Sequence, residues 1–292
     1  MRLHGPTPSP ALRHGYVMIG SVGLLARYQE KAALLGLAAR NLGIAGMLRL
    51  KWQQARVRRG AVTAPYQLHS QHLKYPVWCR PGTTDAHVFH QIFVMREYAC
   101  IDDLAAPQLI LDCGANVGYS SAYFLSRFPR VEIVAIEPDP GNCELLERNV
   151  RPYGRRVRIV QSAVWSHPAA LIVEAAEGHE YGIHVRECRP DETPSLVATD
   201  IPTLLAGTGH DKLDLLKMDV EGAEEVIFSP GCESWLARTD NIVIELHGPA
   251  RVRAFREFVT PDQGTIFDHE ELTVFKRRRT PATPGAHQPA SR

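Results

Sequence analysis

The sequence Leu-Ile-Leu-Asp112-Cys-Gly114-Ala-Asn116-Val-Gly118 joins a short apolar run to a turn that contains two glycines. Glycines let the backbone turn sharply and approach a ligand closely, because no side chain intervenes. The spacing is DxGxxxG, which differs from the GxGxxG turn that directs a helix N-terminus at a pyrophosphate. An acid at the end of the run suits a ligand that carries a cationic or amino group. The pattern therefore favours S-adenosylmethionine over a dinucleotide such as NAD.

A second acid, Glu137, ends the next apolar run. A carboxylate at this position can accept hydrogen bonds from both hydroxyls of a ribose. Ser162 and Ala163, which follow the third apolar run, are expected beside the adenine. The alternative of a purely structural turn with an ion-paired glutamate stays open. The predicted cofactor-binding residues are Asp112, Gly114, Asn116, Gly118, Glu137, Pro138, Ser162 and Ala163.

Charged residues also interrupt two later apolar runs. A central parallel strand is buried on both faces and should be apolar throughout, yet Lys217, Asp219 and Glu221 alternate along one face. Glu245 and His247 share a face of the following run. Unpaired burial of these charges would be prohibitive. We expect Lys217 and Glu245 to form an ion pair, and Asp219, Glu221 and His247 to reach the carboxyl edge of the sheet, where ligands bind.

If the ligand is S-adenosylmethionine, transfer of its methyl group to a hydroxyl oxygen would be an in-line displacement that needs aligned reactants and a base. His247 is a candidate base because its ordinary pKa lies near 6.5. Asp219 could act as the base or could orient the amino group of the cofactor. Asp219 and Glu221 could instead bind Mg²⁺, which would lower the pKa of the alcohol. Two carboxylates are thin support for a metal, so a metal-free site is preferred, and a capping or packing role for His247 stays open.

Elements that could position these residues alternate between strand and helix. Helices are expected over 119–128 and 140–150, the second capped by Asp139. The expected strands are 109–112, 131–136, 157–160, 213–218 and 241–246. This alternation predicts an α/β fold with a parallel sheet and helices on both faces.

A polar, hairpin-like insertion at 165–198 interrupts the alternation. Aromatic residues and histidines in and before this insertion could line the pocket for a methyl acceptor. The candidates are Trp78, His179, Tyr181 and His184.

Four regions divide the chain. Residues 1–60 form a basic, largely helical N-terminal region, within which Gly36, Gly43 and Gly46 are expected to break or bend the helix. Residues 61–106 are a lead-in segment that contains a helix near 89–98, and residues 107–279 are the core. Residues 280–292 are expected to be disordered because prolines and small polar residues dominate them.

Charge is unevenly distributed along the 292 residues. The chain has 33 basic and 32 acidic residues, yet its first 60 residues hold ten Lys or Arg and one acid, Glu30. Such an arm is expected to contact an anionic surface or to pack on its own domain. No run of about 18 uncharged apolar residues occurs, which argues against a spanning helix, and no cleavable signal is recognised. The six scattered cysteines form no CxxC pair and favour a cytoplasmic location, with peripheral membrane contact through the arm as an option.

Four stretches closely resemble the FkbM family of S-adenosylmethionine-dependent methyltransferases. They are DCGANVGYSS, AIEPDPGN, KMDVEGAE and VIELHG, and the segment from Arg80 to Tyr98 resembles the part that precedes the core in that family. The resemblance covers about 75–275. It implies a class I methyltransferase Rossmann-like sheet and O-methylation of a hydroxyl on a sugar, glycolipid or polyketide-like natural product.

Two other functions remain open at this stage. One is a nucleotide-dependent oxidoreductase on the same kind of sheet, against which the DxGxxxG spacing argues. The other is a non-catalytic module that binds through Arg56, Arg58 and Arg59. Nucleic acid is an unfavoured partner because no basic and aromatic residues interleave, and DVEG stands where many amino-methylating enzymes of nucleic acid have an NPPY-like motif.

Overall fold

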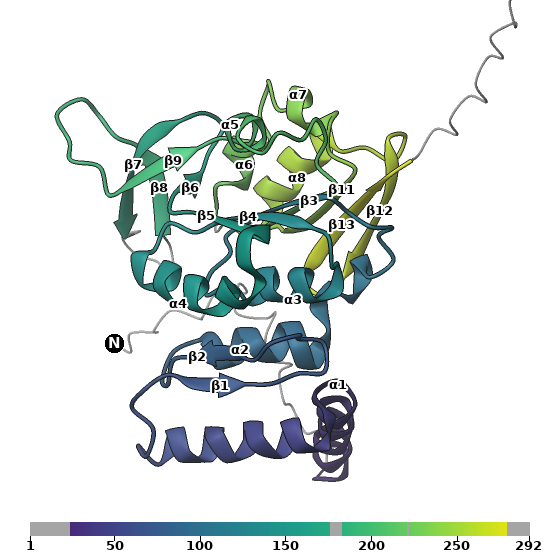
Figure 1. Cartoon of the computed structure of the whole chain (residues 1–292). Coiled ribbons are helices and arrows are strands. Elements are labelled where there is room, and N and C mark those ends of the chain that lie inside the picture. Colours follow the sequence, from purple (N-terminus) through teal and green to yellow (C-terminus); the bar gives the residue numbers. More distant parts are fainter. Residues whose placement is uncertain (1–23, 176–182, 221, 279–292) are drawn as a thin grey trace, which may run out of the picture.

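A seven-stranded sheet forms the centre of the protein (Figure 1). The computed structural model describes residues 24–175, 183–220 and 222–278. Across the sheet the strand order is β12-β13-β11-β10-β3-β4-β5, and β13 runs antiparallel to both of its neighbours. The strands are β3 (Leu109–Cys113), β4 (Glu132–Ile136), β5 (Val157–Val160), β10 (Leu215–Met218), β11 (Asn241–Glu245), β12 (Gly264–His269) and β13 (Leu272–Arg277).

Helices cover both faces of this sheet, which confirms the predicted α/β class. On one face lie α3 (Tyr119–Arg127) and α4 (Pro140–Val150), and the opposite face is covered by the remaining core helices (Figure 1). These are α5 (Ile201–Ala206), α6 (Glu224–Ile227), α7 (Glu233–Leu236) and α8 (Pro249–Phe258). Asp139 caps α4 as predicted, since its side chain accepts a hydrogen bond from the Asn142 N–H. A short 3₁₀ turn (Arg151–Arg156) links α4 to β5.

The predicted insertion is a separate small sheet. Its strands are β6 (Ala163–Val164), β7 (Ala169–Ala175), β8 (Ile183–Glu187) and β9 (Leu196–Thr199), in the order β6-β9-β7-β8. The antiparallel β7–β8 pair confirms the hairpin. His179 and Tyr181, and the side chain of His184, lie outside the described residues, as does the tail predicted to be disordered.

The lead-in segment packs below α3 and α4 (Figure 1). It contains a two-stranded ladder of β1 (Tyr66–Leu68) and β2 (Val77–Cys79), followed by α2 (Asp85–Phe89). A π-helical turn, η2 (His90–Met95), and a 3₁₀ turn, η3 (Glu97–Ile101), continue from α2. The predicted helix near 89–98 is thus present but broken at Arg96, whose φ of 64° is left-handed.

The N-terminal helix α1 (Leu24–Arg58) forms the outermost layer (Figure 1). Of the three glycines expected to bend it, Gly43 does so, with φ 72° and ψ 159°. By length and composition alone, Ala32–Arg58 is apolar enough to cross a membrane, although core helices of soluble proteins also satisfy that criterion. The sequence analysis argued against a spanning helix because charged residues recur within this stretch.

Candidate active site

The turn after β3 lies directly against the end of β10. An added Cβ at Gly114 would lie 1.8 Å from the backbone oxygen of Asp219, and the φ of Gly114 is 77°. No residue with a side chain fits this position without moving the strand end. Glycine is therefore required here for close approach as well as for backbone conformation.

Glu137, at the end of β4, holds the same turn in place. Its buried carboxylate accepts hydrogen bonds from the Asn116 N–H at 2.9 Å and from the Asp139 N–H at 3.1 Å. Asn116 has a φ of 50°, a conformation that asparagine tolerates better than most residues. The carboxylate thereby fixes the turn and remains at the wall of a cavity.

This cavity has a volume of about 470 Å³. It is lined by the carboxyl ends of β3, β4 and β10 and by apolar side chains of the small sheet. Six of the eight predicted cofactor-binding residues line it, together with Asp219 and Val220. The six are Gly114, Asn116, Glu137, Pro138, Ser162 and Ala163.

Asp112 and Gly118 do not line the cavity and instead support its wall. Asp112 is fully buried and accepts hydrogen bonds from the hydroxyls of Ser120 at 2.7 Å and Ser121 at 2.6 Å. An added Cβ at Gly118 would lie 2.5 Å from Leu146, so glycine permits α3 to pack on α4. Both residues support the turn from the side away from the cavity, and their direct contact with a ligand stays a prediction.

Lys217 pairs with Asp112, and the predicted Lys217–Glu245 pair does not form. Its ammonium lies 3.4 Å from Asp112 Oδ1 and donates a hydrogen bond to the Gly114 carbonyl at 2.7 Å. The register of the sheet explains this choice, because Lys217 on β10 lies beside Asp112 on β3. Burial lowers the pKa of Lys217 and the neighbouring Asp112 raises it, with a net rise. The charged Lys217 therefore stabilises the turn through its hydrogen bond to the Gly114 carbonyl.

His247 lies among three carboxylates at the carboxyl edge. Its Nδ1 is 2.5 Å from the fully buried Glu224, and its Nε2 is 3.4 Å from Glu245 and 4.0 Å from Asp219. Hydrogen bonds to Glu224 and then Glu245 raise the pKa of His247 to about 10. The imidazole thus carries a proton at neutral pH. Burial, the largest cause, and Glu245 raise the pKa of Asp219, whereas Lys217 and His247 lower it.

A second, smaller cavity of about 60 Å³ adjoins the first. Gly114, Asn116 and Asp219 line both cavities. Glu97, from η3, enters the smaller one, and its pKa is raised to about 7 by burial and then by Glu245. Sequence reasoning missed Glu97, because no periodic pattern linked an acid of the lead-in segment to the edge of the sheet.

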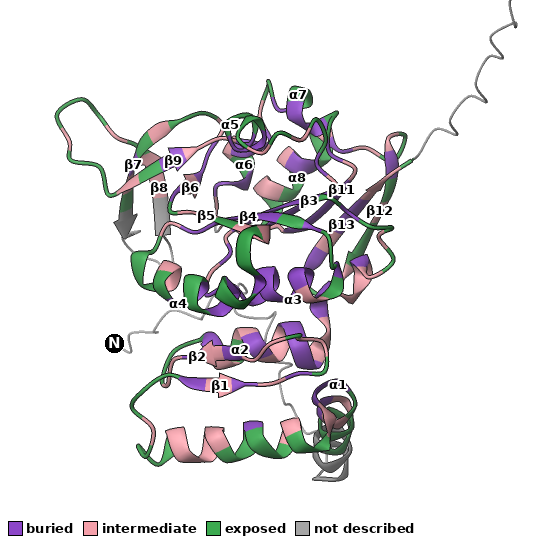
Figure 2. Cartoon of the chain, viewed as in Figure 1, coloured by how far each residue is buried: buried purple, intermediate pink, exposed green. Residues whose placement is uncertain are grey.

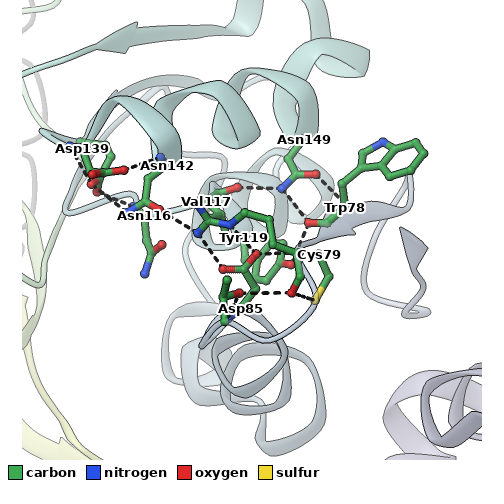
Figure 3. A network of polar contacts seen from close by, with 12 residues as sticks. Trp78, Cys79, Asp85, Asn116, Val117, Tyr119, Asp139, Asn142 and Asn149 are labelled. Atoms are coloured by element: carbon green, nitrogen blue, oxygen red, sulfur yellow. Dashed lines mark hydrogen bonds and ion pairs between the residues drawn. The ribbon is translucent and has the colours of Figure 1, made fainter. Parts of the chain in front are cut away.

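A polar network connects the lead-in segment to this site (Figure 3). Asp85 pairs with Arg80, whose guanidinium donates to Asn142 Oδ1 at 2.8 Å. The Asn142 amide in turn donates to Glu137 at 3.1 Å. Arg80 and Asn142 were not predicted as functional, although their positions within the resembling segments offered a signal.

Trp78 belongs to the same network rather than to an acceptor pocket. Its backbone N–H donates to Asn149 Oδ1 at 2.6 Å (Figure 3). The guanidinium carbon of Arg148 lies 3.4 Å from the centre of its ring. The Asn149 amide also donates to the Val117 carbonyl at 2.7 Å. Trp78 lines neither of these two cavities, and its contacts support a packing role, so its contact with an acceptor stays a prediction.

Asp219, Glu245 and His247 could together hold a cation. One ligand atom from each lies within 4.8 Å of the others. Glu221, which the sequence paired with Asp219 for this purpose, lies outside the described residues. The protonated state of His247 opposes metal ligation, because a histidine ligand must be neutral.

The fold and the turn geometry agree with a protein-family model described as "Methyltransferase FkbM domain", which matches residues 112–277. This match covers more than half of the 292 residues. The chain belongs to the FkbM methyltransferase family. It is an S-adenosylmethionine-dependent methyltransferase. Its family membership therefore argues against the two alternative functions, an oxidoreductase and a non-catalytic module.

Two relatives of this FkbM-family methyltransferase are proteins of Sordaria araneosa and Sinorhizobium fredii. It is 28% identical over 211 residues to methyltransferase sdnD of Sordaria araneosa, covering 61% of this chain and 80% of sdnD. It is 28% identical over 153 residues to 2-O-methyltransferase NoeI of Sinorhizobium fredii (strain NBRC 101917 / NGR234), covering 47% of this chain and 62% of NoeI.

The residues around the larger cavity fit the cofactor of this family. Glu137 offers a fixed carboxylate for ribose hydroxyls, and Gly114 exposes backbone where a side chain would intrude. Ile136, Val164 and Trp165 provide an apolar wall suited to a flat base. Asp219 places negative charge beside the position that a cationic donor would take.

Proposed function

We propose that this FkbM-family methyltransferase methylates a hydroxyl oxygen of a sugar, glycolipid or polyketide-like natural product. The observation that carries the proposal is the position of Asp219, which lines both cavities. Among the described residues, it is the titratable group common to the two. The name of the relative NoeI, a 2-O-methyltransferase, supports oxygen as the acceptor atom.

Gly114, Asn116, Glu137 and Asp219 would hold S-adenosylmethionine in the larger cavity, where the bound cofactor supplies a methyl group activated by a sulfonium. Asp219 accepts the proton of the acceptor hydroxyl, because its raised pKa makes it a stronger base than an exposed aspartate. The protonated His247 faces Asp219 and balances the charge of the surrounding carboxylates. His247 therefore acts as a positioning residue, and Asp219 is preferred as the base.

A cation at Asp219, Glu245 and His247 is the second candidate for the same site. It would lower the pKa of the hydroxyl directly. The high pKa of His247 and the nearby ammonium of Lys217 both disfavour it. We therefore prefer a metal-free reaction for this enzyme.

Labelled methyl donor, incubated with the enzyme and an extract of its source cells, tests the proposal through the linkage of the labelled product. We expect a methyl ether. Asp219→Asn is expected to lower the rate at saturating donor about 10²-fold or more, whereas Asp211→Asn, an exposed match, keeps it. A labelled amine or carbon product would contradict O-methylation. An Asp219→Asn enzyme with weaker donor binding but full turnover would assign Asp219 to the cofactor alone.

A further inference from the structure

The helix α1 exposes a row of large apolar side chains. Ile44, Leu48 and Trp52 are 69%, 59% and 56% exposed. They are spaced four residues apart and so lie along one side of the helix. Earlier in α1, Leu34 and Leu35 are also exposed. Five of the nine large apolar residues that are exposed among the described residues thus belong to this one helix.

The opposite side of α1 is fixed to the protein. Ala38, Leu42 and Leu50 are buried in the core. Asn41 donates a hydrogen bond from its amide to the Val94 carbonyl at 2.8 Å, and Ser70 donates to the Asn41 carbonyl at 3.1 Å. Figure 2 shows this division, with exposed residues on the outward side of the helix. The exposed row is therefore held in one orientation.

Only basic charges accompany this row. Arg49, Lys51 and Arg58 are exposed on the same part of α1, and the Arg56 guanidinium lies 4.6 Å from the centre of the Trp52 ring. From Lys31 to Thr84 the sequence contains no Asp or Glu. We call Ile44, Leu48, Arg49, Lys51, Trp52 and Arg58 the outer face of α1. Its charge is complementary to an anionic surface.

The shape of α1 favours a helix that lies on a bilayer rather than one that crosses it. Gly43 interrupts the helix, so residues 44–58 form a separate segment that is shorter than the ~20 residues needed to span. That segment also contains four basic residues, Arg49, Lys51, Arg56 and Arg58. A helix with apolar and basic residues exposed together is suited to the lipid–water interface, with the cations at the phosphates.

We propose that the outer face of α1 binds the surface of an anionic lipid bilayer. Trp52, Leu48 and Ile44 enter the boundary between headgroups and acyl chains, while Arg49 and Lys51 contact lipid phosphates. Binding then requires both the apolar row and the basic charges. The enzyme associates with the membrane through α1 without inserting a spanning segment.

Co-sedimentation of the full-length protein with vesicles tests this proposal. One set is pure phosphatidylcholine, and the other is an equal mixture of phosphatidylcholine and phosphatidylglycerol. We expect at least about 10-fold tighter binding to the mixed vesicles, weakened by salt. Leu48→Gln with Trp52→Gln, and Arg49→Glu with Lys51→Glu, should each weaken that binding by about 10-fold or more.

Matched controls come from elsewhere on the surface. Val197→Gln removes an apolar side chain that is 67% exposed on β9, and Arg151→Glu with Arg155→Glu reverses two exposed charges after α4. Both should bind vesicles like the unmodified protein, and thermal unfolding verifies that every variant is folded. Absent binding to the mixed vesicles, or unchanged binding by both outer-face variants, would overturn the proposal. The unmodified protein could instead be a dimer that does not bind vesicles, while the Leu48→Gln, Trp52→Gln variant is a monomer. That result would assign the outer face to self-association.

Discussion

Glu224 is fully buried, and its carboxylate lies 2.5 Å from Nδ1 of His247. This contact fixes the orientation of the imidazole, so that Nε2 faces Glu245 and Asp219 at the edge of the site. It also keeps the ring protonated, because the hydrogen bond from His247 stabilises the cation. The contact between Glu224 and His247 thus sets the charge of the proposed acceptor site.

Glu224→Gln should lower the pKa of His247 from about 10 towards its ordinary value of 6.5. The glutamine removes the carboxylate whose hydrogen bond with His247 contributes most to the raised pKa. Titration of the imidazole signals by NMR measures this directly. Glu225→Gln, at the exposed neighbouring position, is the matched control and should leave the titration unchanged. If His247 titrates near pH 6.5 in the unmodified protein, its imidazole is not held in the protonated state and the proposed charge of the site is wrong.

The same shift predicts how stability depends on pH. The folded-state pKa of His247 is raised above its unfolded value, so its contribution is complete below pH 6.5 and is lost as the pH rises through about 10. The free energy of unfolding should fall more between pH 7 and pH 10 in the unmodified protein than in Glu224→Gln. Urea unfolding across this range provides the measurement. Parallel pH curves for the two proteins would contradict the assignment.

Lys217→Met should destabilise the fold by about 3–5 kcal/mol, because it leaves the buried Asp112 without its cation. The double variant Lys217→Met, Asp112→Asn should recover part of this loss, since the neutral amide no longer needs a counter-charge. Urea unfolding compares the three proteins, and Lys212→Met, at an exposed position, is the control. An equal loss in the single and double variants would argue against a Lys217–Asp112 pair.

Gly114→Ala should abolish binding of S-adenosylhomocysteine, because the new methyl group would overlap the Asp219 backbone. Gly209→Ala is a matched control, since Gly209 has the same φ of 77° and nothing within 4 Å of the added Cβ. The control should lose only the ~1–2 kcal/mol of left-handed backbone strain and should keep its affinity. Similar affinity for S-adenosylhomocysteine in both variants would show that the turn accommodates the added methyl group and still binds the ligand.

Removal of divalent cations should leave methyl transfer unchanged. The raised pKa of His247 opposes the loss of the proton that metal ligation requires, so a cation would have to compete with that proton. Initial rates with EDTA, and after re-addition of Mg²⁺, provide the comparison. An activity that EDTA abolishes and Mg²⁺ restores would favour the cation-assisted alternative.

Much of the core could be predicted from local patterns. Apolar runs separated by helical segments predict β3, β4, β5, β10 and β11 with small errors at their ends. The acids and glycines at the strand ends predict residues of the larger cavity, because parallel strands bring their carboxyl ends to one edge. The Asp139 cap could also be predicted, because it joins residues that are close together in the sequence.

The remaining features depend on contacts between distant segments. Lys217 lies beside both β3 and β11, and only the register decides that it pairs with Asp112 rather than Glu245. Glu97 reaches the edge of the sheet through the packing of η3, which no pattern in the sequence specifies. The Arg80–Asn142 contact joins segments separated by two strands, β3 and β4, and by the helices α2 and α3. Such pairings follow from tertiary packing rather than from spacing.

Calorimetric titration with S-adenosylhomocysteine tests the proposed cofactor site most directly. We predict one binding site per chain for the unmodified protein and for Glu144→Gln, an exposed match on α4. Glu137→Ala should weaken the affinity by about 10-fold or more, since it removes a charged acceptor and loosens the Asn116 turn. Absence of binding by the folded, unmodified protein, or equal affinity in Glu137→Ala, would contradict the site described for this enzyme.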